Sequence, residues 1–361
     1  MTYFISELFD SLNSFNILFV WILFYVLSFL AIYLWRDDSN FFLKKNVYAA
    51  AQKVHVGSIS RLGGFIIYAC LCFFSFIEPN AFLIQTPLFC ILPMMLISVK
   101  EDLFFNVSYQ KRFFAIAFSA FCLIYFYLSD FPIINHLPII SNLFEYKSFN
   151  IAFFTLCILI LANGCNFIDG MNGLLSFYIF GVILNCIFLS FIFSDIENGK
   201  VLLIYALLIL SFISLNFPFG KIFLGDSGAY LFAMLLGVWV INFFSMNSNV
   251  SSWNALLIFF YPTSEVLYSF IRKIYQKKSP FKPDRGHLHL KVYDLIRTNN
   301  YKPNHSNNLT TIYLSFFWIA PPLTLPLVYD SQVLIFFSLT FFLVAYLFIN
   351  IKLPFLPRKK Y

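Results

Sequence analysis

Long apolar runs separated by short polar segments are the feature that most constrains the fold of this chain. They cover residues 15–35, 62–77, 82–99, 113–128, 151–161, 174–193, 201–215, 229–244, 253–271, 311–328 and 333–351. A helix needs about 20 apolar residues to cross the hydrocarbon core of a bilayer. Of the 361 residues, 60% are hydrophobic and 11% are charged, which is unlike a soluble domain. We therefore predict an all-α membrane bundle of about eleven transmembrane helices, forming a single domain over residues 1–361.

Basic residues are distributed unevenly among the segments that connect these runs. If the N-terminus is outside, 22 of the 24 lysines and arginines lie in the C-terminal tail or in the inner segments 36–61, 100–112, 163–173, 216–228 and 271–310. Only Lys147 and Lys200 then lie outside. Cytoplasmic loops carry such an excess, so we expect a cytoplasmic C-terminus. The dispersal of the basic residues favours anionic lipids and substrates over a nucleic-acid partner.

The inner segment 163–173 is denser in polar groups than a turn requires. It contains one carboxylate, three side-chain amides and three glycines. A carboxylate at a membrane edge is costly to desolvate unless it meets a cation, a metal or water. Glycine also allows the backbone to approach a ligand closely. An ordinary polar connection is the alternative, but we expect part of a binding site, to which the other inner segments contribute.

The polar motifs of the inner segments follow a recognisable order. They read Lys-x-His and Arg-x-Gly-Gly, a pair of acids, Asn-x-x-Asn-x-x-Asp-Gly-x-Asn-Gly-Leu, Asn-x-Pro with Lys-Ile-Phe-Leu-Gly-Asp-x-Gly, and Asp-Arg-x-His-x-His. Over about residues 53–289 this series resembles the polyprenyl-phosphate N-acetylhexosamine-1-phosphate transferases, of the glycosyltransferase family 4 type.

That resemblance implies a reaction and a location. Such an enzyme transfers a sugar-1-phosphate from a UDP-sugar to undecaprenyl phosphate and releases UMP. The active site would lie at the cytoplasmic surface of the bacterial inner membrane, among membrane lipids, with Mg²⁺ as cofactor and Mn²⁺ as a substitute. A homodimer is left open. Two anionic substrates must be brought together, so a divalent cation and basic groups are needed to offset their repulsion.

The acidic residues of the motifs are the expected metal ligands and catalytic groups. Mg²⁺ prefers oxygen ligands and often takes one or two carboxylates together with substrate phosphates. By the resemblance, Asp226 binds the metal, with capping of the following helix as the alternative. Asp102 binds the metal or acts on the lipid phosphate as a base, and Asp169 supports the metal site or positions the nucleotide phosphate. Glu101 is counted with these catalytic acids, although it stands where the family usually has aspartate.

Histidines and arginines form a second group of expected site residues. His287 and His289, with Arg285, resemble pyrophosphate contacts, and a solvated basic loop is the alternative. Arg112 is open between a phosphate contact and an anchor at the membrane surface. Glu265 replaces a common family aspartate and is expected to be structural.

The remaining expected substrate-binding residues are amides, basic groups and one aromatic side chain. They are Asn163, Asn166, Asn172, Asn216, Lys221, Phe223, Lys53, His55 and Arg61. Capping and turn roles are equally open for the amides. Asn172 stands where the family often has aspartate, and an amide cannot act as a base. Phe223 corresponds to an aromatic residue that stacks on uracil in the family, with core packing as the alternative. Lys53, His55 and Arg61 either meet lipid phosphate or anchor the membrane surface.

Two other functions remain as alternatives. A transporter of an anionic metabolite would place ionisable groups deep inside its spans and on both faces, whereas here they gather on one predicted face. The phospho-N-acetylmuramoyl-pentapeptide transferase reaction belongs to the same family, but its members tend to have three adjacent histidines. The form Asp-Arg-Gly-His-Leu-His favours the branch that primes cell-surface glycans such as O-antigen.

Overall fold

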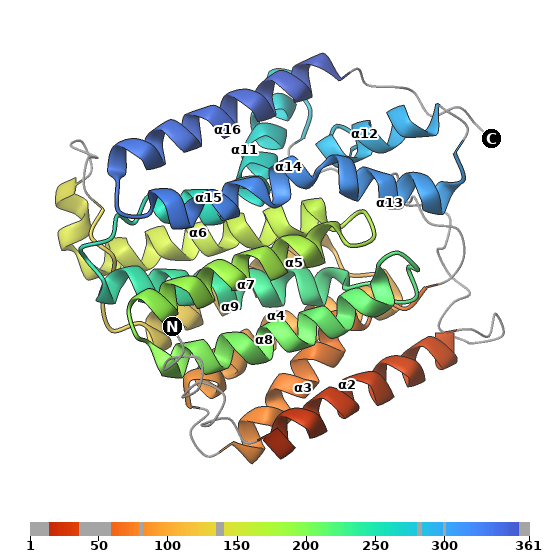
Figure 1. Cartoon of the computed structure of the whole chain (residues 1–361), viewed down its shortest axis with the longest axis horizontal. Coiled ribbons are helices and arrows are strands. Elements are labelled where there is room, and N and C mark those ends of the chain that lie inside the picture. The colour runs from red at the N-terminus through yellow and green to blue at the C-terminus, as the bar shows by residue number, and fades with distance from the viewer. Residues whose placement is uncertain are drawn as a thin grey trace.

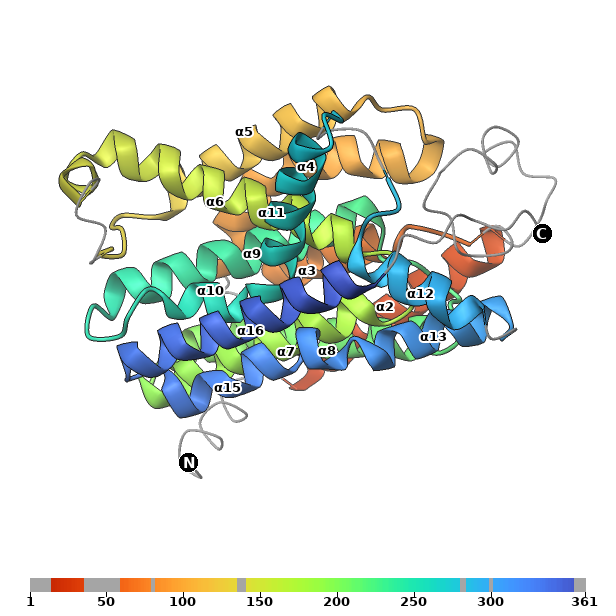
Figure 2. The same cartoon turned by 90° about the horizontal axis from the view of Figure 1, so that it is seen from above.

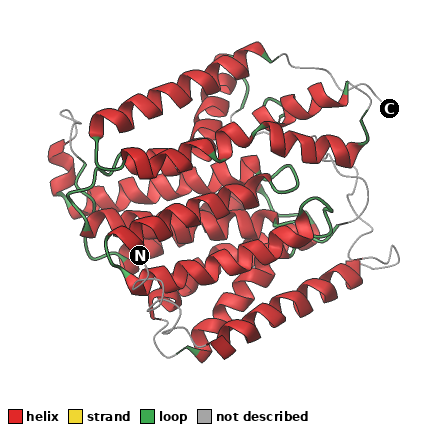
Figure 3. Cartoon of the chain, in the orientation of Figure 1, coloured by secondary structure: helices red, strands yellow, loops and turns green. Residues whose placement is uncertain are grey.

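The computed structural model describes residues 14–35, 59–78, 82–134, 141–279, 284–298 and 301–353. Lys53 and His55 lie outside the described residues. Within those ranges the chain is helical and has no β-strand (Figure 3), which confirms the predicted all-α class. The helices are α2 (Ser14–Trp35), α3 (Gly63–Ile77), α4 (Phe82–Phe104), α5 (Tyr109–Tyr127), η1 (Ser141–Glu145), α6 (Lys147–Ile168), α7 (Leu174–Ile192), α8 (Ile196–Asn216), α9 (Gly225–Met246), α10 (Asn254–Ile258), α11 (Phe260–Tyr275), α12 (Leu288–Arg297), α13 (Pro303–Tyr313), α14 (Ser315–Trp318), α15 (Ala320–Val328) and α16 (Gln332–Lys352).

Helix α9 lies at the centre of the bundle, and α2 and α16 lie at opposite edges (Figure 1). The most apolar stretch of α9 is 83% buried, whereas those of α2 and α16 are each 22% buried. A helix that is hydrophobic on all sides is stable when it is enclosed by protein or lipid. The exposed apolar side chains of the two edge helices are therefore suited to contact with lipid.

Seven helices in the described part of the chain are long and apolar enough to cross a membrane. The number becomes eight if the pair Pro303–Tyr313 and Ser315–Val328, which is bent by 48°, forms one span. Every predicted apolar run overlaps a helix, but some of these helices are short or carry charge near one end. The structure thus confirms a multi-pass helical protein, and the total of eleven spans stays a prediction.

Several predicted boundaries between runs and connections were wrong. The predicted run 253–271 is broken between α10 and α11, and Pro262 lies in the first turn of α11, where its missing N–H is tolerated. The predicted connection 163–173 is helical up to Ile168, and within α6 the amide of Asn163 donates to Leu159 O at 2.7 Å. Parts of segments 100–112, 216–228 and 271–310 are likewise helical.

The connections divide between two ends of the bundle. At one end, the α6–α7 and α8–α9 connections lie beside α12 and α13 (Figures 1 and 2). At the other end, Ser252 donates to Ile133 O at 2.9 Å, and the amide of Asn254 donates to Tyr329 O at 2.9 Å. The described residues of the predicted inner segments that carry polar motifs lie at the first end, where Arg61, Asp102 and Asp226 come together.

Candidate active site

The N-terminal ends of α3 and α9 meet backbone to backbone at the polar end of the bundle. Residues 60–64 run alongside residues 222–224 and are joined to them by backbone hydrogen bonds of 2.8 to 3.0 Å. A Cβ atom on Gly64 would lie 2.0 Å from the backbone nitrogen of Gly228, so only glycine allows this approach. The contact places Arg61 directly beside the first turn of α9.

Four acids and two arginines gather at this junction, and we call them the acid–arginine cluster. Its members are Glu101, Asp102, Asp169, Asp226, Arg61 and Arg112. Arg61 Nη2 lies 2.9 Å from Asp226 Oδ1, and Arg112 Nη1 lies 2.5 Å from Asp226 Oδ2. Both arginines are partly exposed, whereas the Asp226 carboxylate is buried. Asp226 is thus held by two cations from α5 and from the segment before α3.

Asp102 caps the beginning of α9 from a different helix. Its Oδ1 accepts from the backbone N–H of Asp226 and its Oδ2 from that of Ser227, each at 3.0 Å. The side chain is fully buried and also lies 3.5 Å from the guanidinium of Arg61. Gly225 has a φ of +75°, and a Cβ there would lie 2.7 Å from Asp102 Oδ2. The capping role that the sequence left open for Asp226 is therefore filled by Asp102.

Asp169 and Glu101 complete the acidic side of the cluster. Asp169 follows the last residue of α6, and its carboxylate accepts from the backbone of Gly225. Burial raises the pKa of Asp169 to about 7, with Arg61 opposing the shift and the neighbouring aspartates adding to it. Glu101 Oε2 accepts from Val107 N at 2.8 Å, which orders the connection between α4 and α5.

The side-chain amides of the motifs hold the connections together in this structure. Asn216 accepts from Gly173 N at 2.7 Å and donates to Ile222 O at 2.8 Å, which ties the α6–α7 connection to the α8–α9 connection. The backbone N–H of Asn172 donates to the Asn307 side chain of α13 at 2.7 Å. The amide of Asn166 donates to the hydroxyl of Tyr230 on α9. Their contacts favour the turn and packing roles that the sequence left open.

The two histidines of the last motif lie side by side. His287 is in extended backbone just before α12 and His289 is in its first turn, with ring centroids 5.8 Å apart and an interplanar angle of 15°. His289 lies against Gly170, where a Cβ would be 2.5 Å from its Nε2. Burial lowers the pKa of His289 to about 3, and the nearby His287 adds to the effect. The pair thus borders the connection that follows Asp169.

The other expected residues are placed as follows. Arg285 forms an ion pair with Asp294, with Nη2 and Oδ1 2.6 Å apart. Lys221 is exposed and lies over the ring of Phe219, 5.1 Å from its centroid. Phe223 is partly buried in the segment that pairs with residues 60–64.

The sequence did not predict that Arg112 would lie at the centre of the acid–arginine cluster. The adjacent basic pair Lys111-Arg112 was its only signal, and it gave no indication that Arg112 would meet Asp226, 114 residues further along the chain. Glu265 was expected to be structural, and its buried carboxylate lies 3.0 Å from Nδ1 of His287, a partner that the sequence did not indicate. The Asp that precedes Arg285 also has a partner, because Asp284 is held by Arg272 through bonds of 2.9 and 3.0 Å.

The donor groups of the cluster suit a hard cation that needs few protein ligands. In the described ranges, no three His, Cys, Asp or Glu side chains are arranged to hold a metal by themselves. Mg²⁺ commonly takes only one or two carboxylates and completes its shell with water and phosphate. Asp226 and Asp169 offer carboxylate oxygens at one place, and the guanidinium groups on Asp226 show that this position attracts positive charge. The residues therefore fit Mg²⁺.

An apolar cavity of about 340 Å³ lies elsewhere, between α6, α9, α10 and α11. It is lined by residues such as Phe154, Val240 and Phe259 and extends toward Pro132 and Trp253, at the end of the bundle opposite the cluster. Its lining offers no charged group for a nucleotide or phosphate. The acid–arginine cluster, and not this cavity, is therefore the candidate active site.

Comparison with known proteins gives a consistent family. Residues 84–244 match the model of glycosyl transferase family 4. The undecaprenyl-phosphate alpha-N-acetylglucosaminyl 1-phosphate transferase of Thermotoga maritima is 29% identical over 239 residues, covering 66% of this chain and 69% of that protein. The protein of the same name in Escherichia coli is 28% identical over 261 residues, covering 66% of each chain. A decaprenyl-phosphate N-acetylglucosaminephosphotransferase of Mycobacterium leprae is 26% identical over 185 residues, covering 44% of this chain and 43% of that protein.

The family match runs from within α4 to within α9, and it includes the acids at positions 101, 102, 169 and 226. They agree with the order of motifs in the sequence and with the all-helical bundle. The chain is thus similar, over a large part of its length, to glycosyl transferase family 4 and to its polyprenyl-phosphate N-acetylglucosamine-1-phosphate transferases.

Proposed function

We propose that this protein transfers an N-acetylhexosamine-1-phosphate from a UDP-sugar to undecaprenyl phosphate and releases UMP. The lipid-pyrophosphate-linked sugar would prime a cell-surface glycan such as O-antigen. One observation carries the proposal: four acids and two arginines from distant parts of the chain meet where the helices of a membrane bundle end. The names of the relatives supply the substrate class.

The cluster provides both kinds of charge that this reaction needs. When bound, Mg²⁺ neutralises charge on the reacting phosphates and polarises a phosphoryl oxygen. Arg61 and Arg112 present partly exposed guanidinium groups, which bind phosphate well because their geometry matches two oxygens at once. They can therefore hold the two anionic substrates against their mutual repulsion.

Among the acids, Asp169 is the best placed to take a proton. A general base works best when its pKa is near the working pH, and burial raises the pKa of Asp169 to about 7. Both oxygens of Asp102 are engaged by backbone N–H groups, which suits it less to that role. In this proposal Asp169 accepts the proton of the lipid phosphate, and Asp226 is the principal metal ligand.

The proposal includes the topology read from the sequence. Eleven spans, an outside N-terminus and a cytoplasmic C-terminus in the bacterial inner membrane would place the cluster on the face where UDP-sugars are made available. The lysine and arginine distribution supports this orientation. A single membrane domain over residues 1–361 is part of the same proposal.

The test is a transfer assay with purified protein in detergent or nanodiscs. Undecaprenyl phosphate and Mg²⁺ are combined with a panel of UDP-N-acetylhexosamines and with UDP-N-acetylmuramoyl-pentapeptide, and UMP release and lipid product are measured. We expect product with a UDP-N-acetylhexosamine and none with the pentapeptide donor. Lack of product with every sugar would overturn the proposal, and liposome uptake of the same donors without UMP release would favour the transporter.

A further inference from the structure

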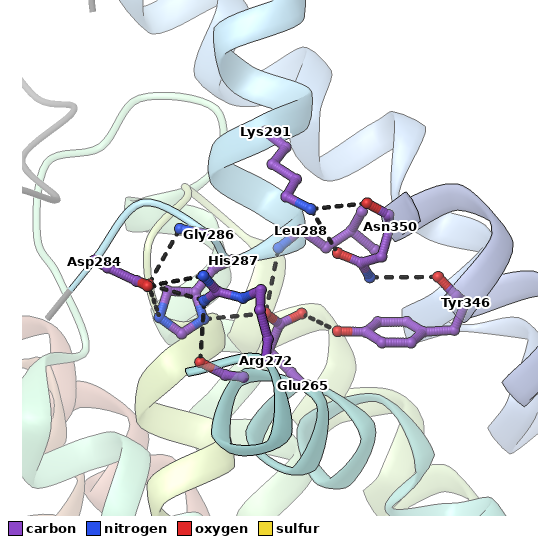
Figure 4. A network of polar contacts seen from close by, with 10 residues as sticks. Glu265, Arg272, Asp284, Gly286, His287, Leu288, Lys291, Tyr346 and Asn350 are labelled. Atoms are coloured by element: carbon purple, nitrogen blue, oxygen red, sulfur yellow. Dashed lines mark hydrogen bonds and ion pairs between the residues drawn. The ribbon is translucent and has the colours of Figure 1, made fainter. Parts of the chain in front are cut away.

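Glu265 is a fully buried carboxylate on α11 that binds groups from two other parts of the chain (Figure 4). Its Oε1 lies 3.0 Å from Nδ1 of His287 and accepts from the backbone N–H of Leu288 at 3.2 Å. Its Oε2 accepts from the hydroxyl of Tyr346 on α16 at 2.7 Å. Buried carboxylates are costly unless they are fully hydrogen-bonded. Three donors on one carboxylate satisfy that requirement.

These contacts fix the tautomer of His287. An ionised carboxylate can only accept hydrogen bonds, so Nδ1 of His287 must carry a proton. Its Nε2 is then the nitrogen that remains for other partners, and it lies 3.9 Å from Asp284 Oδ1. The ring packs against Phe167 at the end of α6, with centroids 4.9 Å apart. Glu265 therefore determines both the orientation of the ring and which nitrogen is available.

The last helix braces the same segment. Most of α16 faces outward, and its two buried polar residues, Tyr346 and Asn350, lie one turn apart on the face toward α12 (Figure 4). Lys291 lies three positions after Leu288 on α12, and its Nζ donates to Asn350 O at 2.8 Å. Asn350 thus contacts α12 directly, whereas Tyr346 reaches the histidine segment through Glu265 on α11.

We propose that Glu265 is a positioning residue for His287 in the transfer reaction, and that Tyr346 holds Glu265 in place. This inference rests on the proposed function. In this proposal Glu265 does not touch the substrate. It keeps Nδ1 of His287 protonated and the imidazole aligned, so that Nε2 is the nitrogen that faces the phosphate-bearing substrate. An orienting carboxylate behind a functional histidine is a common arrangement, and its loss typically costs roughly 10- to 100-fold in activity.

The experiment is a double-mutant cycle on kcat, with the substrate pair identified in the transfer assay. The variants are Glu265→Gln, His287→Asn and the combination of the two. We expect Glu265→Gln to lower kcat by roughly 10- to 100-fold, and to lower it little further when His287 is already Asn. A residue that acts through another gives such a non-additive pair, whereas a residue that only supports the fold lowers activity in both backgrounds.

Tyr346→Phe provides a second variant that keeps the buried ring. Loss of one hydrogen bond to the carboxylate should lower kcat by about 5-fold with the KM for the UDP-sugar unchanged. Tyr68→Phe is the matched control, because Tyr68 is also buried and its hydroxyl donates to Leu88 O at 3.0 Å away from the histidines. If Glu265→Gln fails to fold, the Tyr346 variant in the His287→Asn background carries the cycle.

The outcomes separate this inference from the function on which it rests. An inactive wild-type protein would refute the proposed function. An active wild-type protein whose Glu265 and Tyr346 variants match the Tyr68 control, or whose losses are additive with His287→Asn, would overturn the positioning role alone.

Discussion

Replacement of Asp102 by Asn should destabilise the protein as well as inactivate it. The carboxylate accepts one backbone N–H of α9 with each oxygen, both at 3.0 Å, in a fully buried place. An asparagine can offer only one oxygen, so one N–H would face an NH₂ group. Loss of a hydrogen bond to a charged group and burial of an unpaired donor together cost about 2 to 5 kcal/mol.

The assay is the apparent unfolding temperature in detergent, measured with EDTA so that metal binding does not contribute, followed by the transfer assay with Mg²⁺. Glu101→Gln is the matched control, because an amide oxygen at that position can still accept from Val107 N. It should cost about 1 kcal/mol or less and retain more activity than Asp102→Asn. If the Asp102 variant unfolds at the wild-type temperature and loses only activity, the capping role is wrong and a metal or base role for Asp102 is favoured. Activity in Asp102→Asn with none in Glu101→Gln would mean that the two acids have exchanged roles.

Three further predictions concern the metal, the buried histidine and the topology. Asp226→Asn should lower kcat by on the order of 10²-fold or more, and removal of Mg²⁺ and Mn²⁺ should abolish transfer; near wild-type turnover in a folded variant would refute the assignment. Because the pKa of His289 is lowered to about 3 by burial, the unfolded chain binds more protons between about pH 6.5 and that value. Stability should thus fall as the pH drops through this window, and less steeply in His289→Gln; equal slopes would contradict the burial argument. Reporter fusions at Lys147 and Lys302 should report opposite sides of the membrane, and a common side would exclude the predicted topology.

The helical class was predictable because apolar run length and composition determine it almost alone. The ends of helices were not, since polar side chains were taken as connections. Asn163 is an example: it lies inside α6 and its amide donates to Leu159 O of the same helix, so this polar residue does not mark the end of the helix. Pro262 could have indicated the helix start at α11, because proline is tolerated in the first turn of a helix. The sequence just before this proline is apolar, however, and therefore gave no sign of a break.

The sequence predicted which types of residue would belong to the site, but it did not predict which of them would contact one another. The motifs identified Asp226, Asp102 and the two histidines as candidate site residues, because carboxylates and imidazoles are unusual in such an apolar chain. The pairing of Asp226 with Arg112, or of Glu265 with Tyr346, depends on how helices far apart in sequence pack. No local pattern contains that information.

The capping of α9 by Asp102 has a consequence for how phosphate can be bound. The N-terminus of a helix carries about half a positive charge from the aligned peptide dipoles and is a frequent anion site. Here the carboxylates of Asp102 and Asp226 already lie at that end, and Asp102 takes up the free N–H groups of the first turn. The positive end of α9 is thus neutralised from within the protein, which leaves the guanidinium groups of Arg61 and Arg112 as the positive charges beside it.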